Sequence, residues 1–216
     1  METDHTVAEK RLLDSVLRPG TVALDAGCGR TTRLRHYRDR IELLVGVDAD
    51  EPAGRENPYI DEFVPADLDA PLPFSDDAFG LVYANFVLEH LANPEHAFRE
   101  WRRVLRPGGG LVLVTTNRSS PFMALAARLP EGIRLTIKRR GAGAAERDVY
   151  PTRYLANTPT RLERVAHAAG FRTVELVMVG TLHRYGARFP GLSATLRATE
   201  RLLPPSRRST IVVAFH

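Results

Sequence analysis

Apolar residues in the first 117 positions follow two spacings that alternate along the chain. Helical spacing predicts amphipathic helices at 6–18 and from Pro94 to the "RPGGG" at 106–110, and residues 31–38 also look helical. The segment 49–58 is too rich in proline, glycine and acid for a full helix. Short apolar runs, which are typical of buried strands, lie at 21–26, from Ile41 to the acids Asp48 and Asp50, from Tyr59 to the acids Asp67 and Asp69, up to about Asn85, and at 111–117.

Strands that alternate with helices favour an α/β fold, a doubly wound and mostly parallel sheet with helices on both faces. The last third of the chain continues differently. Residues 118–150 combine an apolar and basic stretch with a Gly/Ala-rich link, which predicts an insertion or lid. A helix capped by Thr158, a strand at 171–179, a helix at 190–203 and a strand at 209–215 follow. We expect one domain over residues 1–216.

Composition narrows the class of protein. With 44% hydrophobic and 26% charged residues the chain resembles ordinary globular proteins. No apolar run is long enough to span a bilayer and the first residues do not resemble a signal peptide, so we expect a cytoplasmic protein. The net charge of +4 comes from basic residues spread along the chain, which is weak support for nucleic-acid binding. The single cysteine, Cys28, excludes an intramolecular disulfide.

Polar residues and glycines follow four of the predicted strands, where a doubly wound sheet binds ligands. Gly27 and Gly29 allow a sharp turn and a close approach of the backbone to a ligand. Asp48 is placed to accept hydrogen bonds from both hydroxyls of a ribose. Asp67 and Leu68 suit an adenine ring, and Asn85 would lie near the reactive end. Taken singly, each of these residues is equally compatible with a turn, a cap or a loop.

Together these residues indicate a ligand containing adenosine, which both nicotinamide cofactors and S-adenosylmethionine contain. A dinucleotide fingerprint would place its third glycine at position 32. The chain has Thr32 there, and this disfavours a pyrophosphate ligand.

At this point the chain resembles the class I S-adenosylmethionine-dependent methyltransferases. The motifs that carry the resemblance stand in order between about residues 20 and 117: "LDAGCGR", "VGVDAD", "PADLDAPLPFSDDAFGLVYANFVLEHL" and "FREWRRVLRPGGGLVLVTTN". The resemblance implies a seven-stranded sheet whose last strand, at 209–215, runs antiparallel between the fifth and sixth. It also implies that S-adenosylmethionine, and its product S-adenosylhomocysteine, bind at Asp25, Gly27, Cys28, Gly29, Asp48, Ala49, Asp67, Leu68, Asn85 and Phe86.

A sulfonium methyl group is already activated, so a catalytic base is helpful but not obligatory. His90, with Glu89 beside it, is the candidate base; the alternative is that the two residues form a capping pair in the first turn of a helix. Some methyltransferases that resemble this one hold a metal through another glutamate three residues before such an "EH" pair. Phe86 stands there, so we predict no metal. Cys28 is interpreted as a small turn residue, because no base is visibly paired with it.

The segment before the sixth strand resembles the substrate side of small-molecule methyltransferases. Tyr150, Tyr154 and Asn157 are candidate acceptor-binding residues, together with His183 or Tyr185 after that strand; packing beneath a lid is the alternative. The amphipathic stretch 121–140, with Arg134, Lys138, Arg139 and Arg140, suits a membrane surface or an anionic or lipid-linked acceptor, although a solvated face is the plainer interpretation.

The sequence therefore predicts a methyltransferase for a small molecule, which we describe as a glycan-related, lipid-like or secondary-metabolite acceptor. A methyltransferase for RNA or protein, and a catalytically silent protein that binds the cofactor, remain alternatives. The sequence specifies neither the acceptor and its methylated atom nor the oligomeric state.

Overall fold

One seven-stranded sheet forms the centre of the computed structural model, which describes residues 5–126, 128–129, 132, 151–186 and 190–216. The strand order is β3-β2-β1-β4-β5-β7-β6, with the first five parallel and β7 antiparallel to both its neighbours. This arrangement confirms the predicted fold class, including the place of the last strand. The strands are β1 (Thr21–Ala26), β2 (Ile41–Asp48), β3 (Glu62–Pro65), β4 (Phe79–Asn85), β5 (Leu105–Thr116), β6 (Thr173–Val179) and β7 (Thr210–Phe215).

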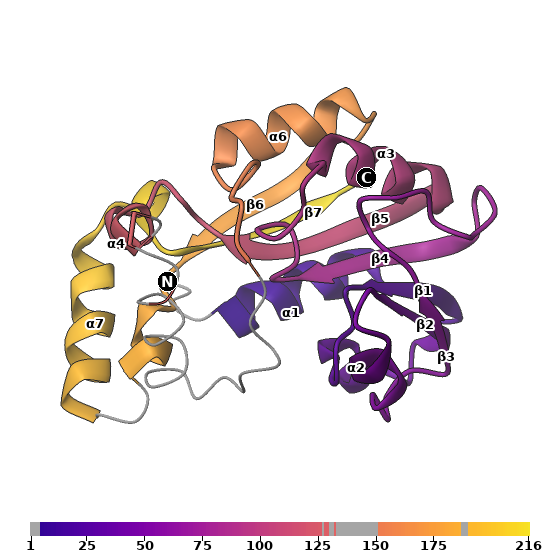
Figure 1. The fold of residues 1–216 in the computed structure, drawn as a ribbon, viewed down its shortest axis with the longest axis horizontal. Helices are drawn as coiled ribbons and strands as arrows, with labels where there is room; N and C mark the ends of the chain where they lie inside the picture. Colours follow the sequence, from indigo (N-terminus) through magenta and orange to yellow (C-terminus); the bar gives the residue numbers. More distant parts are fainter. Residues whose placement is uncertain (1–4, 127, 130–131, 133–150, 187–189) are drawn as a thin grey trace.

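Helices cover both faces of the sheet, as Figure 1 shows with α1 on one face and α3 and α6 on the other. The side chains of the inner strands alternate between two cores. Leu24 and Ala26 pack with α3 and α6, whereas Ala23, which precedes Leu24, packs with α1. The α-helices are α1 (His5–Val16), α2 (Glu51–Arg55), α3 (Pro94–Val104), α4 (Pro121–Ala126), α6 (Pro159–Ala168) and α7 (Pro190–Leu202), and the 3₁₀ helices are η1 (Arg33–Tyr37), η4 (Leu182–Gly186) and η5 (Pro205–Arg207).

The strand order reverses between β1 and β4, and this places the loops after these two strands side by side. The chain moves outward from β1 through β2 to β3, then returns to β4 beside β1. Gly27, just after β1, packs so closely against the loop after β4 that a β-carbon there would lie 2.3 Å from Cγ2 of Val87. A crevice at such a reversal is the usual ligand site of a doubly wound sheet.

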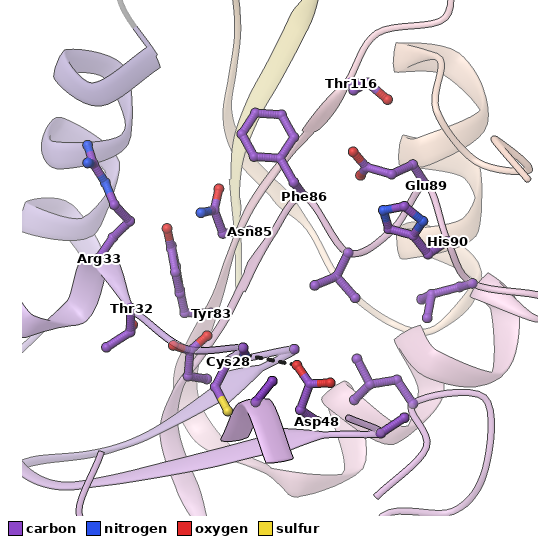
Figure 2. Close-up of a pocket in the computed structure, with 18 of the residues that line it drawn as sticks. Cys28, Thr32, Arg33, Asp48, Tyr83, Asn85, Phe86, Glu89, His90 and Thr116 are labelled. Carbon is purple, nitrogen blue, oxygen red and sulfur yellow. Dashed lines mark hydrogen bonds between the residues drawn. The ribbon is translucent and has the colours of Figure 1, made fainter. Parts of the chain in front are cut away.

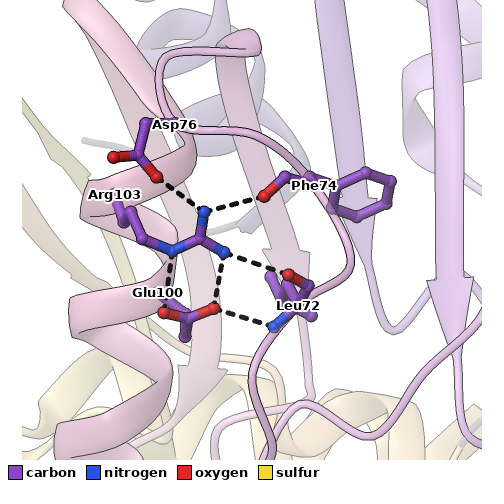
Figure 3. Close-up of polar contacts among 5 residues, drawn as sticks. All are labelled: Leu72, Phe74, Asp76, Glu100 and Arg103. Atoms are coloured by element: carbon purple, nitrogen blue, oxygen red, sulfur yellow. Dashed lines mark hydrogen bonds and ion pairs between the residues drawn. The ribbon is translucent and has the colours of Figure 1, made fainter.

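Arg103 of α3 holds the loop that leads from β3 to β4 (Figure 3). Its Nη1 donates to the carbonyl of Phe74 and to Asp76 at 2.7 and 2.8 Å, and its Nη2 donates to the carbonyl of Leu72 at 3.0 Å. Nε and Nη2 of Arg103 also donate to the carboxylate of Glu100, which in addition accepts the backbone N–H of Leu72 at 2.8 Å. All five guanidinium hydrogens thus have an acceptor, and the loop that follows Asp67 and Leu68 is tied to α3.

The structure differs from the sequence pattern in two elements. Residues 31–38 form only the short 3₁₀ helix η1, whose first turn is capped by the Thr32 hydroxyl accepting from the N–H of Leu34 at 3.1 Å. The helix that precedes "RPGGG" ends at Val104, close to the predicted boundary, but the fifth strand begins earlier than the predicted residue 111. The "RPGGG" segment belongs to β5, which begins at Leu105, and it enters the sheet with a register shift opposite Phe79 and Leu81.

Of the expected insertion at 118–150, the structure describes residues 118–126, which include α4, and residues 128, 129 and 132; the remainder lies outside the described residues. Its basic residues, Arg134, Lys138, Arg139 and Arg140, and the candidate Tyr150 fall in that part. No helix among the described residues is long and apolar enough to cross a membrane.

Candidate functional site

A cavity of about 720 Å³ opens at the carboxyl ends of the parallel strands, at the reversal between β1 and β4. Figure 2 shows part of its lining, with residues of the loops after β1, β2 and β4 converging on one space. This space brings together most of the residues singled out from the sequence: Asp25, Gly27, Cys28, Gly29, Asp48, Ala49, Asp67, Leu68, Asn85, Phe86, Glu89, His90 and Tyr154.

The turn after β1 is held by backbone and side-chain hydrogen bonds from β2 and from the segment after α2. Gly27 and Gly29 both have positive φ, +80° and +47°, which glycine adopts without strain. The N–H of Gly29 donates to Oδ2 of Asp48 at 2.9 Å. Asn57, which the sequence analysis did not single out, donates from Nδ2 to the carbonyls of Cys28 and Gly29 at 3.1 Å. A polar residue in a Pro/Gly-rich segment gives no local signal for such a long-range contact.

Asp48 ends β2 and faces the cavity beside this turn (Figure 2). Besides the bond from Gly29, its Oδ1 accepts the N–H of Asp50 at 2.9 Å. A carboxylate oxygen has a further lone pair for a second donor. The carboxylate is therefore fixed in orientation by the backbone and retains acceptor capacity toward a ligand, as a ribose site requires.

Asp25 is the most desolvated acid of the cavity, with only 2% of its surface exposed. Burial raises its pKa to about 7, and the negative charges of Asp48 and Glu9 add to that rise, while a hydrogen bond from Thr32 opposes it. Its Oδ2 has no hydrogen-bond partner among the described residues. A buried carboxylate in this condition attracts a cationic group in the cavity.

A buried cluster from α1 and β4 lies beneath Asp25. The hydroxyl of Tyr83 donates to Glu9 of α1, and Glu9 also lies 3.5 Å from Nε of Arg33. Burial raises the pKa of Glu9, an effect that the bond from Tyr83 and the charge of Arg33 partly offset. Tyr83 and Arg33 line the cavity, so the first helix contributes to the floor of the site. Sequence reasoning missed this contribution, because Glu9 lies in an ordinary amphipathic pattern.

The loop after β3 carries the two residues that are predicted to contact the adenine. Leu68 is buried and Asp67 exposed, and both line the cavity. Asp67 accepts the N–H of Asp69 at 2.9 Å, and the carboxylate of Asp69 accepts the N–H groups of Ala92 and Asn93 at 2.8 and 2.7 Å. These bonds join the loop to the start of α3, next to the Arg103 contacts.

The loop after β4 crosses the middle of the cavity (Figure 2). Oδ1 of Asn85 is buried and has no partner among the described residues, so it is available to a ligand. Phe86 has a φ of +55°, a conformation that costs energy for a bulky side chain, and its ring packs edge-on against His5 of α1 at 6.1 Å. Strain of this kind is common where a loop is shaped for binding.

Glu89 and His90 lie in a turn that precedes α3 and do not form its first helical turn. The helix begins at Pro94, capped by Asn93, so the capping-pair alternative is wrong. Glu89 is buried and its Oε2 accepts the hydroxyl of Thr115 at 2.8 Å. Nδ1 of His90 lies 2.7 Å from the carbonyl oxygen of Pro151. A carbonyl accepts only, so Nδ1 carries a proton, and in the neutral form of the ring the lone pair lies on Nε2.

Cys28 is packed into the turn. Its Sγ lies where a β-carbon on Gly46 of β2 would come within 2.8 Å of it. Burial raises the pKa of the Cys28 thiol well above its usual range, and the charges of Asp25 and Asp48 add to this. Since the thiolate is the nucleophile, this environment supports the interpretation of Cys28 as a turn residue.

Of the candidate acceptor-binding residues, some line the cavity and others do not. Tyr154, with a φ of +55°, lines the cavity. Asn157 is buried behind the lining and donates to Oγ1 of Thr115 at 2.7 Å, so it connects the end of β5 to the segment before α6. His183 lies in η4 outside the lining. Tyr150 lies outside the described residues. The lining instead includes residues that the sequence analysis did not name: Arg153, Thr181, Arg184, Ser209 and Thr210.

Metal ligands are not gathered in the described part of the chain, where no group of three His, Cys, Asp or Glu side chains is placed to hold an ion. The absence of a metal stays a prediction.

Comparison with known proteins gives the family. Residues 24–113 match the family model described as a methyltransferase domain. A malonyl-[acyl-carrier protein] O-methyltransferase of Erwinia pyrifoliae is 34% identical over 116 residues, a region that covers 51% of this chain and 44% of the relative. The match thus spans less than half the length of that curated relative.

Solved structures share the whole fold. An S-adenosylmethionine-dependent methyltransferase from Mesorhizobium loti superposes with a TM-score of 0.62 at 18% identity, covering 97% of this chain and 95% of the other. A geranyl diphosphate C-methyltransferase from Streptomyces coelicolor, crystallised with Mg²⁺, geranyl diphosphate and S-adenosylhomocysteine, reaches 0.64 at 15% identity, covering 97% and 76%. The predicted resemblance to the class I S-adenosylmethionine-dependent methyltransferases is confirmed: residues 24–113 match a methyltransferase domain, and the chain shares its fold with S-adenosylmethionine-dependent methyltransferases, whose cofactor is S-adenosylmethionine.

The cavity fits this cofactor. Asp25 offers a buried carboxylate with an unpartnered oxygen to a cationic group, and Asp48 offers an oriented acceptor to hydroxyls. Leu68 offers an apolar surface to a ring. When bound, S-adenosylmethionine supplies a methyl group on a positively charged sulfur.

Proposed function

We propose that this chain transfers a methyl group from S-adenosylmethionine to a small-molecule acceptor. The observation that carries the proposal is one continuous cavity of about 720 Å³, which extends from Asp48 and Asp67 to Tyr154 and Thr210. Small-molecule sites commonly measure about 300–1,000 Å³. One ligand space that reaches both edges of the crevice suits a cofactor and an acceptor side by side.

The named acceptors of similar proteins support this class. The Erwinia relative is named for a malonyl group on a carrier protein, and the Streptomyces neighbour for geranyl diphosphate. Both acceptors present a small organic group to the cofactor. By the same reasoning we expect the reacting group of the acceptor to enter the cavity, whether that group belongs to a free small molecule or is attached to a carrier.

The residues of the cofactor side have distinct roles in this proposal. Asp25 pairs with a cationic group of the cofactor, Asp48 accepts from the ribose, and Asp67 with Leu68 contacts the adenine. The loop contacts of Arg103 and Asp69 hold these groups in place before the ligand arrives, which lowers the ordering cost of binding.

His90 is the proposed base for an acceptor that must lose a proton. The bond from Nδ1 to Pro151 orients the ring and keeps the basic lone pair on Nε2. Glu89 is a positioning residue in this scheme. Its carbonyl oxygen accepts the N–H groups of Arg153 and Tyr154 at 2.7 and 3.1 Å, so it holds the segment that carries Pro151 beside His90.

Calorimetric titration with S-adenosylmethionine, S-adenosylhomocysteine and NAD in parallel tests the cofactor part. We expect binding of the first two and none of NAD. Asp48→Ala should weaken that binding by about 1–3 kcal/mol, because the ribose hydroxyls and the N–H of Gly29 lose their acceptor. Binding of NAD alone, or full affinity in the variant, would contradict the assignment.

Detection of S-adenosylhomocysteine released from an acceptor panel tests the transfer. Turnover with a small molecule supports the proposal. Turnover only with RNA or protein would show that the protein is a methyltransferase for that class of macromolecule. If the acceptor is RNA, its affinity should fall steeply as the salt concentration rises. Cofactor binding without turnover on any class of acceptor would support a silent, cofactor-binding protein.

A further inference from the structure

The two sides of the cavity carry opposite charge. The loops after β1, β2 and β3, which we call the β1–β3 side, contribute the carboxylates of Asp25, Asp48, Asp67 and Asp69. The residues from Thr116 onward that line the cavity, which we call the β5–β7 side, include no acid in the described part of the chain. Their polar members are two arginines and five residues with a hydroxyl group, namely Thr116, Arg153, Tyr154, Thr181, Arg184, Ser209 and Thr210.

The two arginines of the β5–β7 side have no carboxylate partner among the described residues. Arg30 and Arg33, which line the cavity on the β1–β3 side, are paired with Glu56 and Glu9. No described carboxylate lies within ion-pair distance of Arg153 or Arg184. The contrast is that Arg184 acts on Glu9 only from beyond ion-pair distance, where its charge lowers the pKa of that carboxyl, whereas Arg30 and Arg33 are held in ion pairs.

Local contacts hold both residues at the site without neutralising them. Nη1 of Arg184 lies 3.0 Å from Nε2 of His5, and since arginine only donates, the imidazole accepts this bond as a neutral ring. The backbone N–H of Arg153 donates to the carbonyl oxygen of Glu89 at 2.7 Å, two residues after the carbonyl that orients His90. Each arginine is thus attached to an element that also lines or floors the cavity.

Three hydroxyls of this side are buried and bonded to one another. Oγ1 of Thr181 lies 3.1 Å from Oγ of Ser209 and 2.7 Å from Oγ1 of Thr210. These hydroxyls are dipoles without a negative charge, so among the described residues of this side no carboxylate competes for the arginines. Glu89 of the loop after β4 also lines the cavity, and its carboxylate accepts the hydroxyl of Thr115.

We propose that the β5–β7 side binds a negatively charged acceptor, a carboxylate or a phosphate ester, and that Arg153 and Arg184 recognise its charge. That the bound anion is the methyl acceptor rests on the proposed function. The binding of an anion at this side does not depend on it. Guanidinium groups bind both anions through paired N–H groups. The same side repels the cationic end of the cofactor, and this directs the two ligands to opposite sides of one cavity.

A pair of fluorescent probes that differ only in charge tests the site. Dansylglycine and dansylglycinamide carry the same ring and differ by a carboxylate against a carboxamide. Titrated into the protein saturated with S-adenosylhomocysteine, the carboxylate should bind roughly 10- to 100-fold more tightly. Arg153→Gln and Arg184→Gln should each reduce this preference, and the double variant should abolish it. A second pair, dansylaminoethyl phosphate with dansylaminoethanol, determines whether phosphate or carboxylate is preferred.

Arg99→Gln is the matched control, because Arg99 is exposed on α3 and does not line the cavity. It should leave the preference unchanged. Equal affinity for the two probes, no binding of either, or a preference that survives the double variant would overturn the proposal. Separate titration of S-adenosylhomocysteine distinguishes the two failures: if the cofactor does not bind, the proposed function fails, and the probes titrated into the ligand-free protein still decide the anion site.

Discussion

The two sides of the cavity are built in different ways. On the β1–β3 side the lining residues follow the strands directly, within a few positions of each strand end, and their orientation is set by backbone hydrogen bonds to Asp48 and Asp67. On the β5–β7 side the lining comes from connections between distant elements, with Arg153 before α6 and Arg184 in η4. The ends of the strands form the β1–β3 side, whereas segments that connect distant elements form much of the β5–β7 side.

We interpret this difference as a separation between the binding of the cofactor and the choice of the acceptor. Strand ends in a parallel sheet are rigid and converge, so one arrangement of acids serves one cofactor. Connections are free to change in length and charge without altering the sheet. The predictions below test whether the two sides behave as independent parts.

Replacement of His90, on the loop between the two sides, should have the largest effect. If His90 removes the acceptor's proton, His90→Ala lowers turnover by about 10²- to 10⁴-fold. The affinity for S-adenosylhomocysteine should remain, because the cofactor contacts lie elsewhere. Steady-state turnover and calorimetry measure the two quantities, and His36→Ala, an exposed histidine outside the cavity, is the control. Unchanged turnover would remove His90 from the mechanism.

Two glycines of one turn should differ in their tolerance of a methyl group. Gly27→Ala should cost about 2–4 kcal/mol of stability, because its φ is +80° and the new β-carbon would meet Val87. Gly29→Ala should cost about 1 kcal/mol, since its β-carbon would have no atom within 4 Å and only the positive φ opposes it. Chemical denaturation measures both. Equal costs would show that the contact between the loops after β1 and β4 carries no energy.

Asp25→Asn should weaken cofactor binding and stabilise the ligand-free protein. We expect a loss of about 2–3 kcal/mol in affinity for S-adenosylhomocysteine, because the charge that attracts a cation is removed. The dansylglycine preference should not change if the two sides are independent. Loss of both would show that they are coupled.

The stability of the Asp25 variant should depend on pH. Burial raises the pKa of Asp25 to about 7, so folding favours the protonated form. Its stabilising contribution is complete below the ordinary pKa of 3.8 and is lost as pH rises through about 7. Asn does not titrate. The variant should therefore gain roughly 2–3 kcal/mol relative to the parent between about pH 5 and about pH 8, measured by denaturation. A constant difference would show that Asp25 ionises normally.

Replacement of Arg103, which holds the loop between β3 and β4, should have the smallest effect. Arg103→Gln leaves the carbonyls of Leu72 and Phe74 without their donor, which should cost about 1–2 kcal/mol of stability. Cofactor affinity should fall only a few-fold, because Arg103 acts through the loop. Thermal unfolding and calorimetry measure the two. A stability unchanged from the parent would mean that Asp76 and Glu100 contribute nothing through this contact.

The sequence by itself determined the sheet and the cofactor side. Short apolar runs separated by helical patterns predicted the parallel strands, and Gly27, Gly29, Asp48 and Asp67 could be located because each follows a strand end. A residue that lies just after a predicted strand can be located from the sequence of that one segment. The contribution of Glu9 of α1 was missed, and "RPGGG" was not recognised as the start of β5, because tertiary contacts override the local preference there.

Only the tertiary structure decided the rest of the site. The unpartnered carboxylate of Asp25 depends on how β1, β2 and α1 pack around it. The proton on Nδ1 of His90 depends on a carbonyl 61 residues away, and the position of Arg184 depends on a helix 179 residues away. Desolvation, ion pairing and tautomer are properties of a residue's neighbours in space, and separations of this length leave no pattern in the sequence.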